Sequence, residues 1–157
     1  MLAYRITHKK FSGELFAPGI KGRWNSTGKK VIYCAQSVAL AFLENMVRRQ
    51  GVGFNRDFKT MIIEIPGDLA MTIINAGDLK SGWRDYRDYS HCQPLGDRWY
   101  DDGETAVLKA PSAVLPESYN YVLNTEHAMY KKIKLIGVTD LVPDERIEDI
   151  LKKYKGK

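Results

Sequence analysis

The sequence predicts an α+β fold, with central antiparallel or mixed β-sheets flanked by helices. Short apolar runs of strand length outnumber the candidate helices, and they do not alternate with helices in the regular order of a parallel sheet. The 157 residues contain no internal repeat and no low-complexity linker, so we expect one domain over residues 1–157. A chain of this length can bury roughly 70% of its unfolded surface.

The N-terminal part of the chain predicts two strands and one helix. Leu2 to Thr7 and Val31 to Ala35 are apolar runs of strand length. Between them lies a long loop marked by turn-forming residues, namely Gly13, Pro18, Gly19 and Gly22. Ser37 is a suitable N-cap for a helix that runs to about Arg49, and Gly51 and Gly53 are expected to end it.

On a helical wheel this helix has one apolar stripe, formed by Leu40, Leu43, Met46 and Val47. On the same wheel three polar residues face away from the stripe, namely Asn45, Arg48 and Arg49. Glu44 falls at the edge of the stripe, which is a suitable place for a functional carboxylate beside a cleft. The alternative for Glu44 is a surface ion pair with Arg48, one helical turn away.

The rest of the chain predicts more strands and two further helices. The strand candidates are residues 60–65, 71–74, 106–109, 112–115, 119–123 and 135–141. Pro111 separates the runs 106–109 and 112–115. A short helix is expected over Pro94 to Asp102. Pro143 is expected to begin a final amphipathic helix that ends near Tyr154 and faces inward with Ile147, Ile150 and Leu151.

Basic residues are concentrated near the N-terminus. Residues 1–50 contain nine Lys or Arg but only two acidic residues, Glu14 and Glu44, in a chain of formal net charge +5. This asymmetry favours an anionic partner, which can be a nucleotide, a nucleic acid or an acidic protein. The alternative is a solvated surface with unevenly placed charges.

Cysteine usage and hydropathy indicate a cytoplasmic protein. The two cysteines, Cys34 and Cys92, are too few for a disulfide framework, and the three histidines lack ligand spacing, so no metal is expected. No apolar run approaches the ~18 residues that cross a bilayer, and the N-terminus lacks the apolar segment of a signal peptide. We therefore expect no membrane association.

Two familiar motif classes do not fit this chain. Gly22 and Gly28-Lys29 suggest a phosphate-binding P-loop, but five residues separate the glycines instead of four, and Lys30 stands where Ser or Thr would bind magnesium. The candidate serines Ser37, Ser112 and Ser118 lack the Gly-x-Ser-x-Gly turn of hydrolases. Nucleotide binding of the P-loop type and a serine nucleophile therefore have no motif support.

Three side chains in the first fifty residues suit the cleavage of a nucleotide such as NAD. Arg23 can bind a phosphate with both arms of its guanidinium, Tyr33 can pack on a flat ring, and Glu44 can stabilise positive charge on a sugar. Each residue also has a structural alternative. Arg23 can stack on Trp24 or extend into solvent, and Tyr33 can be an ordinary half-buried strand aromatic.

Together with their neighbours, these residues resemble the RES domain, the toxin of RES–Xre toxin–antitoxin systems. The resemblance runs from about Tyr4 to Asp140 and rests on Tyr4-Arg5, Gly22-Arg23-Trp24-Asn25-Ser26, Val31-Ile32-Tyr33, Ala39-Leu40-Ala41-Phe42-Leu43-Glu44, Gly96-Asp97-Arg98-Trp99, Ala110-Pro111-Ser112-Ala113-Val114-Leu115-Pro116 and Asn120-Tyr121-Val122-Leu123-Asn124.

The resemblance implies a fold similar to ADP-ribosyltransferase toxins and an activity that consumes NAD. The bond to nicotinamide would be cleaved by hydrolysis or phosphorolysis, or ADP-ribose would be transferred to a protein. NAD is then a substrate, inorganic phosphate is a possible co-substrate, and no resident cofactor is expected. The implied partner is an Xre-like helix-turn-helix antitoxin. The toxin would contact DNA only through this antitoxin. The sequence leaves open whether the toxin forms a homo-oligomer.

The family pattern maps onto four catalytic candidates, Glu44, Arg23, Tyr33 and Ser112. Arg5 and Asn120 join Arg23 and Tyr33 as candidates for binding NAD. The Ser112 hydroxyl would bond the substrate or Glu44, or, as a structural alternative, the backbone at a strand edge. Asn120 can instead hold a turn. The tryptophans Trp24, Trp83 and Trp99 are expected in the core.

Two other functions remain open at the level of sequence. An RNA-acting toxin is supported by the basic, aromatic-bearing loop Lys21 to Lys30, which can follow a phosphate backbone. No RNA-binding motif and no histidine-based acid–base pair accompany that loop. The third alternative is a non-enzymatic binding module whose basic face meets an acidic partner.

Overall fold

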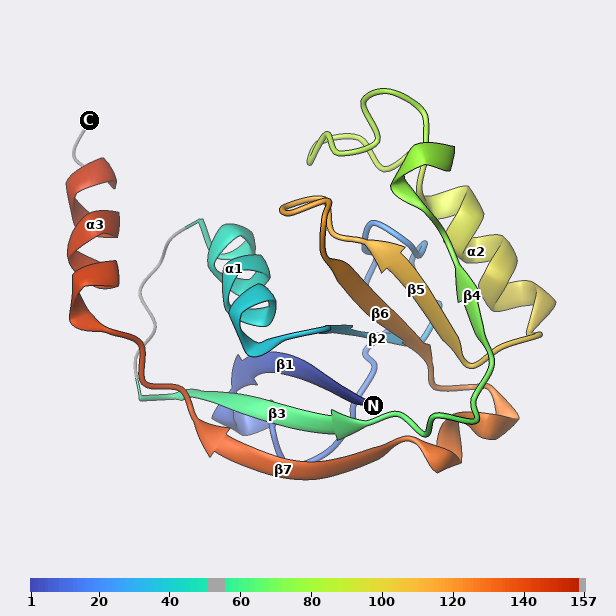
Figure 1. The fold of residues 1–157 in the computed structure, drawn as a ribbon, viewed down its shortest axis with the longest axis horizontal. Helices are drawn as coiled ribbons and strands as arrows, with labels where there is room; N and C mark the ends of the chain where they lie inside the picture. Colours follow the sequence, from blue (N-terminus) through green and yellow to red (C-terminus); the bar gives the residue numbers. More distant parts are fainter. Residues whose placement is uncertain (51–55, 156–157) are drawn as a thin grey trace.

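The computed structural model describes residues 1–50 and 56–155, which form a seven-stranded sheet and three α-helices (Figure 1). The strands are β1 (Leu2–His8), β2 (Val31–Ala35), β3 (Phe58–Glu64), β4 (Met71–Ile73), β5 (Val107–Pro111), β6 (Tyr119–Asn124) and β7 (Lys134–Asp140). The helices are α1 (Val38–Arg48), α2 (Gln93–Asp102) and α3 (Glu145–Lys155). The sheet order is β4-β5-β6-β2-β1-β3-β7, with only β4 and β5 parallel among these strands. This mixed sheet with helices confirms the predicted α+β class.

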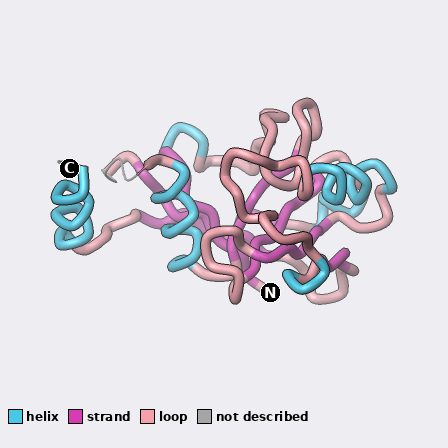
Figure 2. Tube along the Cα trace, turned by 90° about the horizontal axis from the view of Figure 1, so that it is seen from above, coloured by secondary structure: helices cyan, strands magenta, loops and turns pink. Residues whose placement is uncertain are grey.

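The sheet is nearly divided between β1 and β2. These two strands share one described residue pair, Tyr4 with Ala35, whereas β1 pairs with β3 along its whole length. In Figure 1 β1, β3 and β7 run nearly horizontally, whereas β5 and β6 run steeply across the picture. Helix α1 packs on β1 and β2 at this junction, and Figure 2 shows long loops between α1 and α2.

The core consists of three apolar clusters, two of which pack α1 and α2 against the sheet. Helix α1 buries Leu40 and Ala41 against Ile6, Ala35 and Phe58. On the far half of the sheet, the three tryptophans pack with strand residues and α2, as expected: Trp24, Trp83 and Trp99. The third cluster includes Ala3, Ile32, Ile63 and Leu123.

The predicted strand over residues 112–115 is wrong. Strand β5 continues through Pro111, and the chain then turns at Ser112. The turn forms because the Ser112 hydroxyl oxygen accepts hydrogen bonds from the backbone N–H groups of Val114 (3.1 Å) and Leu115 (3.0 Å). Such local bonds compete with a strand ladder. Pro111 ends the strand instead of separating two strands.

The helical wheel of α1 was wrong for Asn45, Arg49 and Val47, whereas Arg48 is exposed as predicted. Asn45 donates from Nδ2 to the backbone oxygen of Ile6 at 2.9 Å, and the Arg49 guanidinium lies 3.9 Å from the centre of the Phe58 ring. Both side chains therefore turn toward the sheet, whereas Val47 is 51% exposed. Ser37 is the N-cap, as predicted, and accepts from the backbone N–H of Leu40 at 3.1 Å. Gly51 and Gly53 lie outside the described residues.

Helix α3 differs from its prediction in its start and in one inward side chain. It begins at Glu145, after Pro143, and Ile150 is 53% exposed. Figures 1 and 2 show α3 standing apart from the sheet, so the packing that would bury Ile150 is missing within the described residues. The side chain of Leu151 is not among those that the structure describes. Over the described residues, no helix combines the length and apolarity needed to cross a bilayer.

Candidate functional site

Glu44 accepts hydrogen bonds from two side chains that come from distant parts of the chain. Its Oε1 atom accepts from the Ser112 hydroxyl at 2.7 Å and from Nδ2 of Asn120 at 2.6 Å. No described residue donates to the other carboxylate oxygen, Oε2. The expected alternative, an ion pair between Glu44 and Arg48, is absent among the described residues. Glu44 therefore belongs to a built site, with one oxygen fixed and one available.

The pairing of β2 with β6 brings Tyr33 close to this carboxylate. Tyr33 lies opposite Val122, and Ala35 lies opposite Asn120, so Tyr33 and Asn120 are diagonal neighbours. Side chains two residues apart share one face of a strand, and such diagonal neighbours are about 7–8 Å apart. The same face is covered by α1, which carries Glu44.

The Tyr33 hydroxyl is fully engaged with the loop that precedes its strand. It donates to Oδ1 of Asn25 at 2.7 Å and accepts from the backbone N–H of Trp24 at 2.9 Å. A β-carbon added to Gly22 would lie 2.7 Å from this hydroxyl oxygen, so a glycine is needed there. Burial raises the pKa of Tyr33 above its ordinary value. Its ring can still contact a ligand, since the residue is only half-buried.

Arg23 binds backbone oxygens of a second loop. Its guanidinium donates to the carbonyl oxygens of Trp83, Arg84 (3.2 Å) and Asp85 (3.3 Å). It also lies 4.8 Å from the centre of the Tyr89 ring. Both structural alternatives, stacking on Trp24 and free extension into solvent, are therefore excluded. A guanidinium has five N–H donors, of which three bind carbonyl oxygens here, and the group also interacts with the Cys92 thiol.

Helix α2 holds the loop that carries Arg23. The backbone N–H of Ser26 donates to Oδ1 of Asp97 at 2.9 Å, and Gln93 donates from Nε2 to the Gly22 oxygen at 3.0 Å. Gly96 permits the close approach, because a β-carbon there would lie 1.8 Å from the Trp24 carbonyl oxygen. Sequence reasoning gave Gln93 and Asp97 no role, although Gly96 and Asp97 lie in one of the motifs that resembled the RES domain.

Arg5 lies apart from the other candidates. Its strand neighbours Tyr4 and Ile6 pack toward α1, so strand alternation turns Arg5 to the other face of the sheet. There it lines a cavity of about 230 Å³ together with Thr7, Glu14 and apolar residues of the following loop. Burial lowers the pKa of Arg5. No described hydrogen bond or ion pair links it to Glu44, so its predicted role in binding NAD has no geometric support here.

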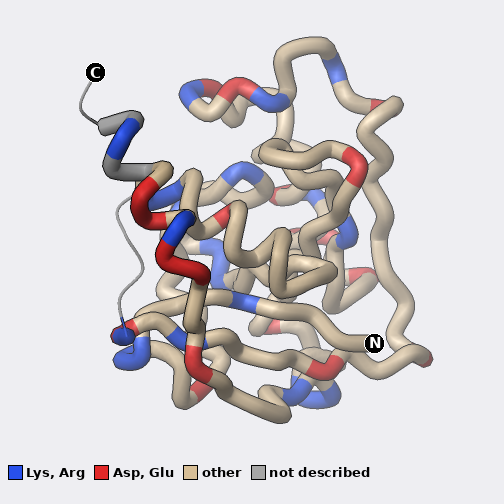
Figure 3. The backbone as a smooth tube through the Cα atoms, turned by 60° about the vertical axis from the view of Figure 1, so that its left-hand side comes forward, with Lys and Arg blue, Asp and Glu red and all other residues tan. Residues whose placement is uncertain are grey.

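The basic loop of residues 21–30 is partly neutralised. Lys29 forms an ion pair with Asp101, and Lys30 lies 3.4 Å from Oε1 of Glu126. Figure 3 shows acidic positions interleaved with basic ones along much of the chain. These pairs weaken the case for a continuous RNA-binding surface.

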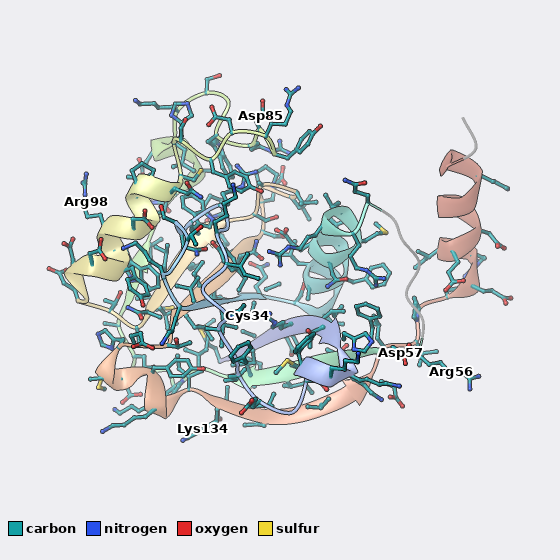
Figure 4. The ribbon with its side chains drawn as sticks, turned by 180° about the vertical axis from the view of Figure 1, so that it is seen from behind. Cys34, Arg56, Asp57, Asp85, Arg98 and Lys134 are labelled. Carbon is teal, nitrogen blue, oxygen red and sulfur yellow. The ribbon has the colours of Figure 1, made fainter. Side chains whose placement is uncertain are left out.

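Both cysteines are buried, and Sγ of Cys92 donates to the backbone oxygen of Trp83 at 3.6 Å. Cys34 lies within the body of the protein (Figure 4), and burial raises the pKa of its thiol to about 12. Across residues 1–50 and 56–155, no group of three or more His, Cys, Asp or Glu is arranged to hold a metal ion.

The same fold occurs in a solved structure. A chain of the crystal structure of the M. tuberculosis MbcT–MbcA toxin–antitoxin complex matches with a TM-score of 0.74, covering 99% of this chain and 89% of that one. The two sequences are 18% identical, so the likeness establishes the fold alone.

The family follows from sequence comparison. The model of the RES domain matches residues 2–147. Toxin Res of Pseudomonas putida is 32% identical over 82% of this chain and 86% of its own, and the Prs ADP-ribosylating toxin of a Sphingobium strain is 31% identical over 80% of each. Toxin Res of Yersinia enterocolitica is 29% identical over 83% of this chain and 88% of its own. The chain belongs to the RES domain family of toxins.

Proposed function

We propose that this RES-family toxin acts by cleaving the bond between nicotinamide and ribose in NAD. The observation that carries the proposal is the double hydrogen bond to Oε1 of Glu44 from Ser112 and Asn120, which leaves Oε2 without a described partner. A carboxylate fixed in this way can act on a substrate through its second oxygen without first reorganising.

Glu44 matches the charge that develops during this reaction. Nicotinamide in NAD carries positive charge and is a good leaving group, and its departure leaves an oxocarbenium-like ribosyl centre, as in glycoside hydrolysis. Oε2 of Glu44 would stabilise that centre or hold a ribose hydroxyl. It could also orient the group that attacks the sugar.

Arg23 and Tyr33 would bind the remainder of the substrate. The positive charge and planar shape of the Arg23 guanidinium suit the pyrophosphate, for which a guanidinium is better matched than an ammonium group. The ring of Tyr33 lies on the same sheet face as Asn120 and can stack on nicotinamide or contact a ribose.

The acceptor of the ADP-ribosyl group defines the alternatives. Water or inorganic phosphate would give an NAD-degrading enzyme, which is our main proposal. A protein acceptor would give an ADP-ribosyltransferase, and this second candidate is favoured by the name of the Sphingobium relative, an ADP-ribosylating toxin.

The proposed partner is an Xre-like antitoxin with a helix-turn-helix portion. The structural match to a toxin–antitoxin complex supports an antitoxin as the partner. Expression of this chain alone should then arrest growth and lower cellular NAD, and co-expression of a neighbouring helix-turn-helix gene should restore both.

The direct test incubates purified protein with NAD, with and without inorganic phosphate. Nicotinamide release is followed by chromatography, and the second product is identified by mass spectrometry as free ADP-ribose, its phosphorylated form or ADP-ribose attached to protein. Glu44→Gln serves as the matched control. Absence of nicotinamide release by folded wild-type protein in every condition would refute the proposal, and cleavage of added RNA instead would support the RNA-acting alternative.

A further inference from the structure

Arg84 joins the two sides of the candidate site, although no role has been assigned to it. Its Nε donates to the backbone oxygen of Ala113 at 2.8 Å, and one of its terminal nitrogens donates to the backbone oxygen of Val114 at 3.4 Å. Its own backbone oxygen accepts from Arg23 at 3.2 Å. The side chain of Arg84 thus reaches the turn that begins at Ser112, while its main chain is held by Arg23.

The two carbonyl groups that Arg84 binds belong to the same peptide units that hold the Ser112 hydroxyl. A peptide unit is planar and contains the carbonyl of one residue and the N–H of the next. The unit with the Ala113 carbonyl therefore contains the Val114 N–H, and the unit with the Val114 carbonyl contains the Leu115 N–H. Both N–H groups donate to Oγ of Ser112, at 3.1 and 3.0 Å.

A continuous hydrogen-bond chain thus runs from the Arg84 guanidinium to Glu44. The cation binds the carbonyl ends of two peptide units, their N–H ends bind the Ser112 oxygen, and the Ser112 hydroxyl donates to Oε1 of Glu44 at 2.7 Å. Hydrogen bonds in such a chain polarise one another in the same direction, so the positive charge strengthens each donor along it. Ser112 is fully buried, so water does not replace its own partners, whereas the two bonds from Arg84 lie at the exposed end of the chain.

We propose that Arg84 is a positioning residue of the Glu44 site, acting through the two peptide units after Ser112. This inference rests on the proposed cleavage of NAD. Since Arg84 acts on the carboxylate and not on the substrate, its loss should lower kcat more than it changes KM. The contact from Arg23 survives in Arg84→Ala, because that contact is to the main chain.

The kinetic test measures nicotinamide release by wild type, Arg84→Ala, Ser112→Ala and the double variant. We expect Arg84→Ala to lower kcat by about tenfold, the lower end of what the loss of an orienting group costs, with KM within about twofold. In the Ser112→Ala background the same substitution should have no further effect, because the chain is already broken there. Arg84→Lys should restore part of kcat.

The matched control is Arg87→Ala, which removes a neighbouring loop arginine that pairs with Asp85 and is exposed. It should leave kcat unchanged. Independent, additive losses from Arg84→Ala and Ser112→Ala would overturn the inference, as would full kcat in Arg84→Ala when Ser112→Ala is impaired.

Amide hydrogen exchange separates this inference from the proposed function. Exchange of the Val114 and Leu115 amide hydrogens, measured by NMR, should be faster in Arg84→Ala than in wild type or Arg87→Ala. The reason is that the carbonyl oxygens of their peptide units no longer bind a guanidinium. If wild type releases no nicotinamide, the proposed function fails, and exchange alone then decides whether Arg84 holds the turn. Unchanged exchange at both amides would overturn the inference.

Discussion

The two sides of the candidate site are built from different chemical groups. The carboxylate region consists of Glu44, Ser112 and Asn120, and the hydrogen bonds among these three residues join side chains. The arginine region consists of Arg23 and residues 83–85, and its hydrogen bonds run from a side chain to backbone oxygens. A side-chain network depends on residue identity, whereas a backbone network depends on how a loop is placed. Substitutions in the two regions should therefore have different effects on activity and stability.

The largest effect is expected at Glu44. Glu44→Gln keeps the shape of the side chain and an oxygen that can accept from Ser112 and Asn120, but it removes the charge that would face the ribosyl centre. We expect nicotinamide release to fall by about 10³-fold, within the range for a positioned acid or base. Circular dichroism should show an unchanged fold. A residual rate above about a tenth of wild type would contradict the role of the carboxylate.

A smaller effect is expected at Arg23, where charge alone is not sufficient. Arg23→Lys keeps the charge but not the planar fork that binds three carbonyl oxygens and suits an anionic group. Since a hydrogen bond to a charged group contributes about 1.5–3 kcal/mol, kcat/KM should fall by about 10- to 100-fold, mostly through KM. Steady-state kinetics measures how the loss is divided between kcat and KM. If KM stays at the wild-type value, Arg23 does not bind the substrate.

The placement of the loop that carries Arg23 should also depend on the close contact between Gly96 of α2 and the Trp24 carbonyl oxygen. Gly96→Ala would place a β-carbon 1.8 Å from the Trp24 carbonyl oxygen, so the loop carrying Arg23 must shift. We expect a loss of about 2 kcal/mol, or about 4–8 °C in Tm, although alanine normally favours a helix by about 1 kcal/mol.

The control for this prediction is Gly77→Ala, because no atom lies within 4 Å of the added β-carbon there. Its Tm should stay within about 2 °C of wild type. Thermal unfolding followed by circular dichroism compares the two variants. Equal Tm values for both would show that the Gly22–Ser26 loop is not fixed by α2.

The smallest effect is expected at Tyr33, which lies between the two regions. Tyr33→Phe keeps the ring but removes the hydroxyl that bonds Trp24 and Asn25, so we expect a loss of about 1 kcal/mol and a several-fold loss of activity. A loss as large as that of Glu44→Gln would place the hydroxyl in the chemistry itself.

Tyr33 also predicts a dependence of stability on alkaline pH. Burial raises the folded pKa of Tyr33 above the ordinary value of 10.0. Above about pH 10 the unfolded chain releases this proton while the folded protein keeps it, so stability falls as pH rises. The difference in Tm between wild type and Tyr33→Phe should therefore narrow between pH 9 and 11. A constant difference would show that the hydroxyl titrates normally.

Most of the fold could be predicted from the sequence because its strands are short apolar runs with clear ends. Val31–Ala35 was predicted to the residue, and Ser37 was recognised as a helix cap by its side-chain chemistry. The run 112–115 misled the prediction because apolar residues there follow a serine that bonds their own backbone. The wheel of α1 failed at Asn45 and Arg49, whose partners on β1 and β3 are invisible to helical periodicity.

The two regions of the site also differed in how far sequence could describe them. Glu44, Ser112 and Asn120 were all named as candidates, and a bond between Ser112 and Glu44 was among the expected outcomes. The partners of Arg23 were missed because backbone oxygens carry no residue signature. Arg84 was missed for the same reason, since it too binds backbone oxygens.

The measurement that tests the central claim most directly is a crystal structure of Glu44→Gln with NAD. If the carboxylate and arginine regions form one site, a single NAD molecule should span them. Its nicotinamide–ribose bond should lie beside residue 44, and its pyrophosphate should lie within hydrogen-bond distance of Arg23. NAD bound in the cavity lined by Arg5, with both regions empty, would contradict this account.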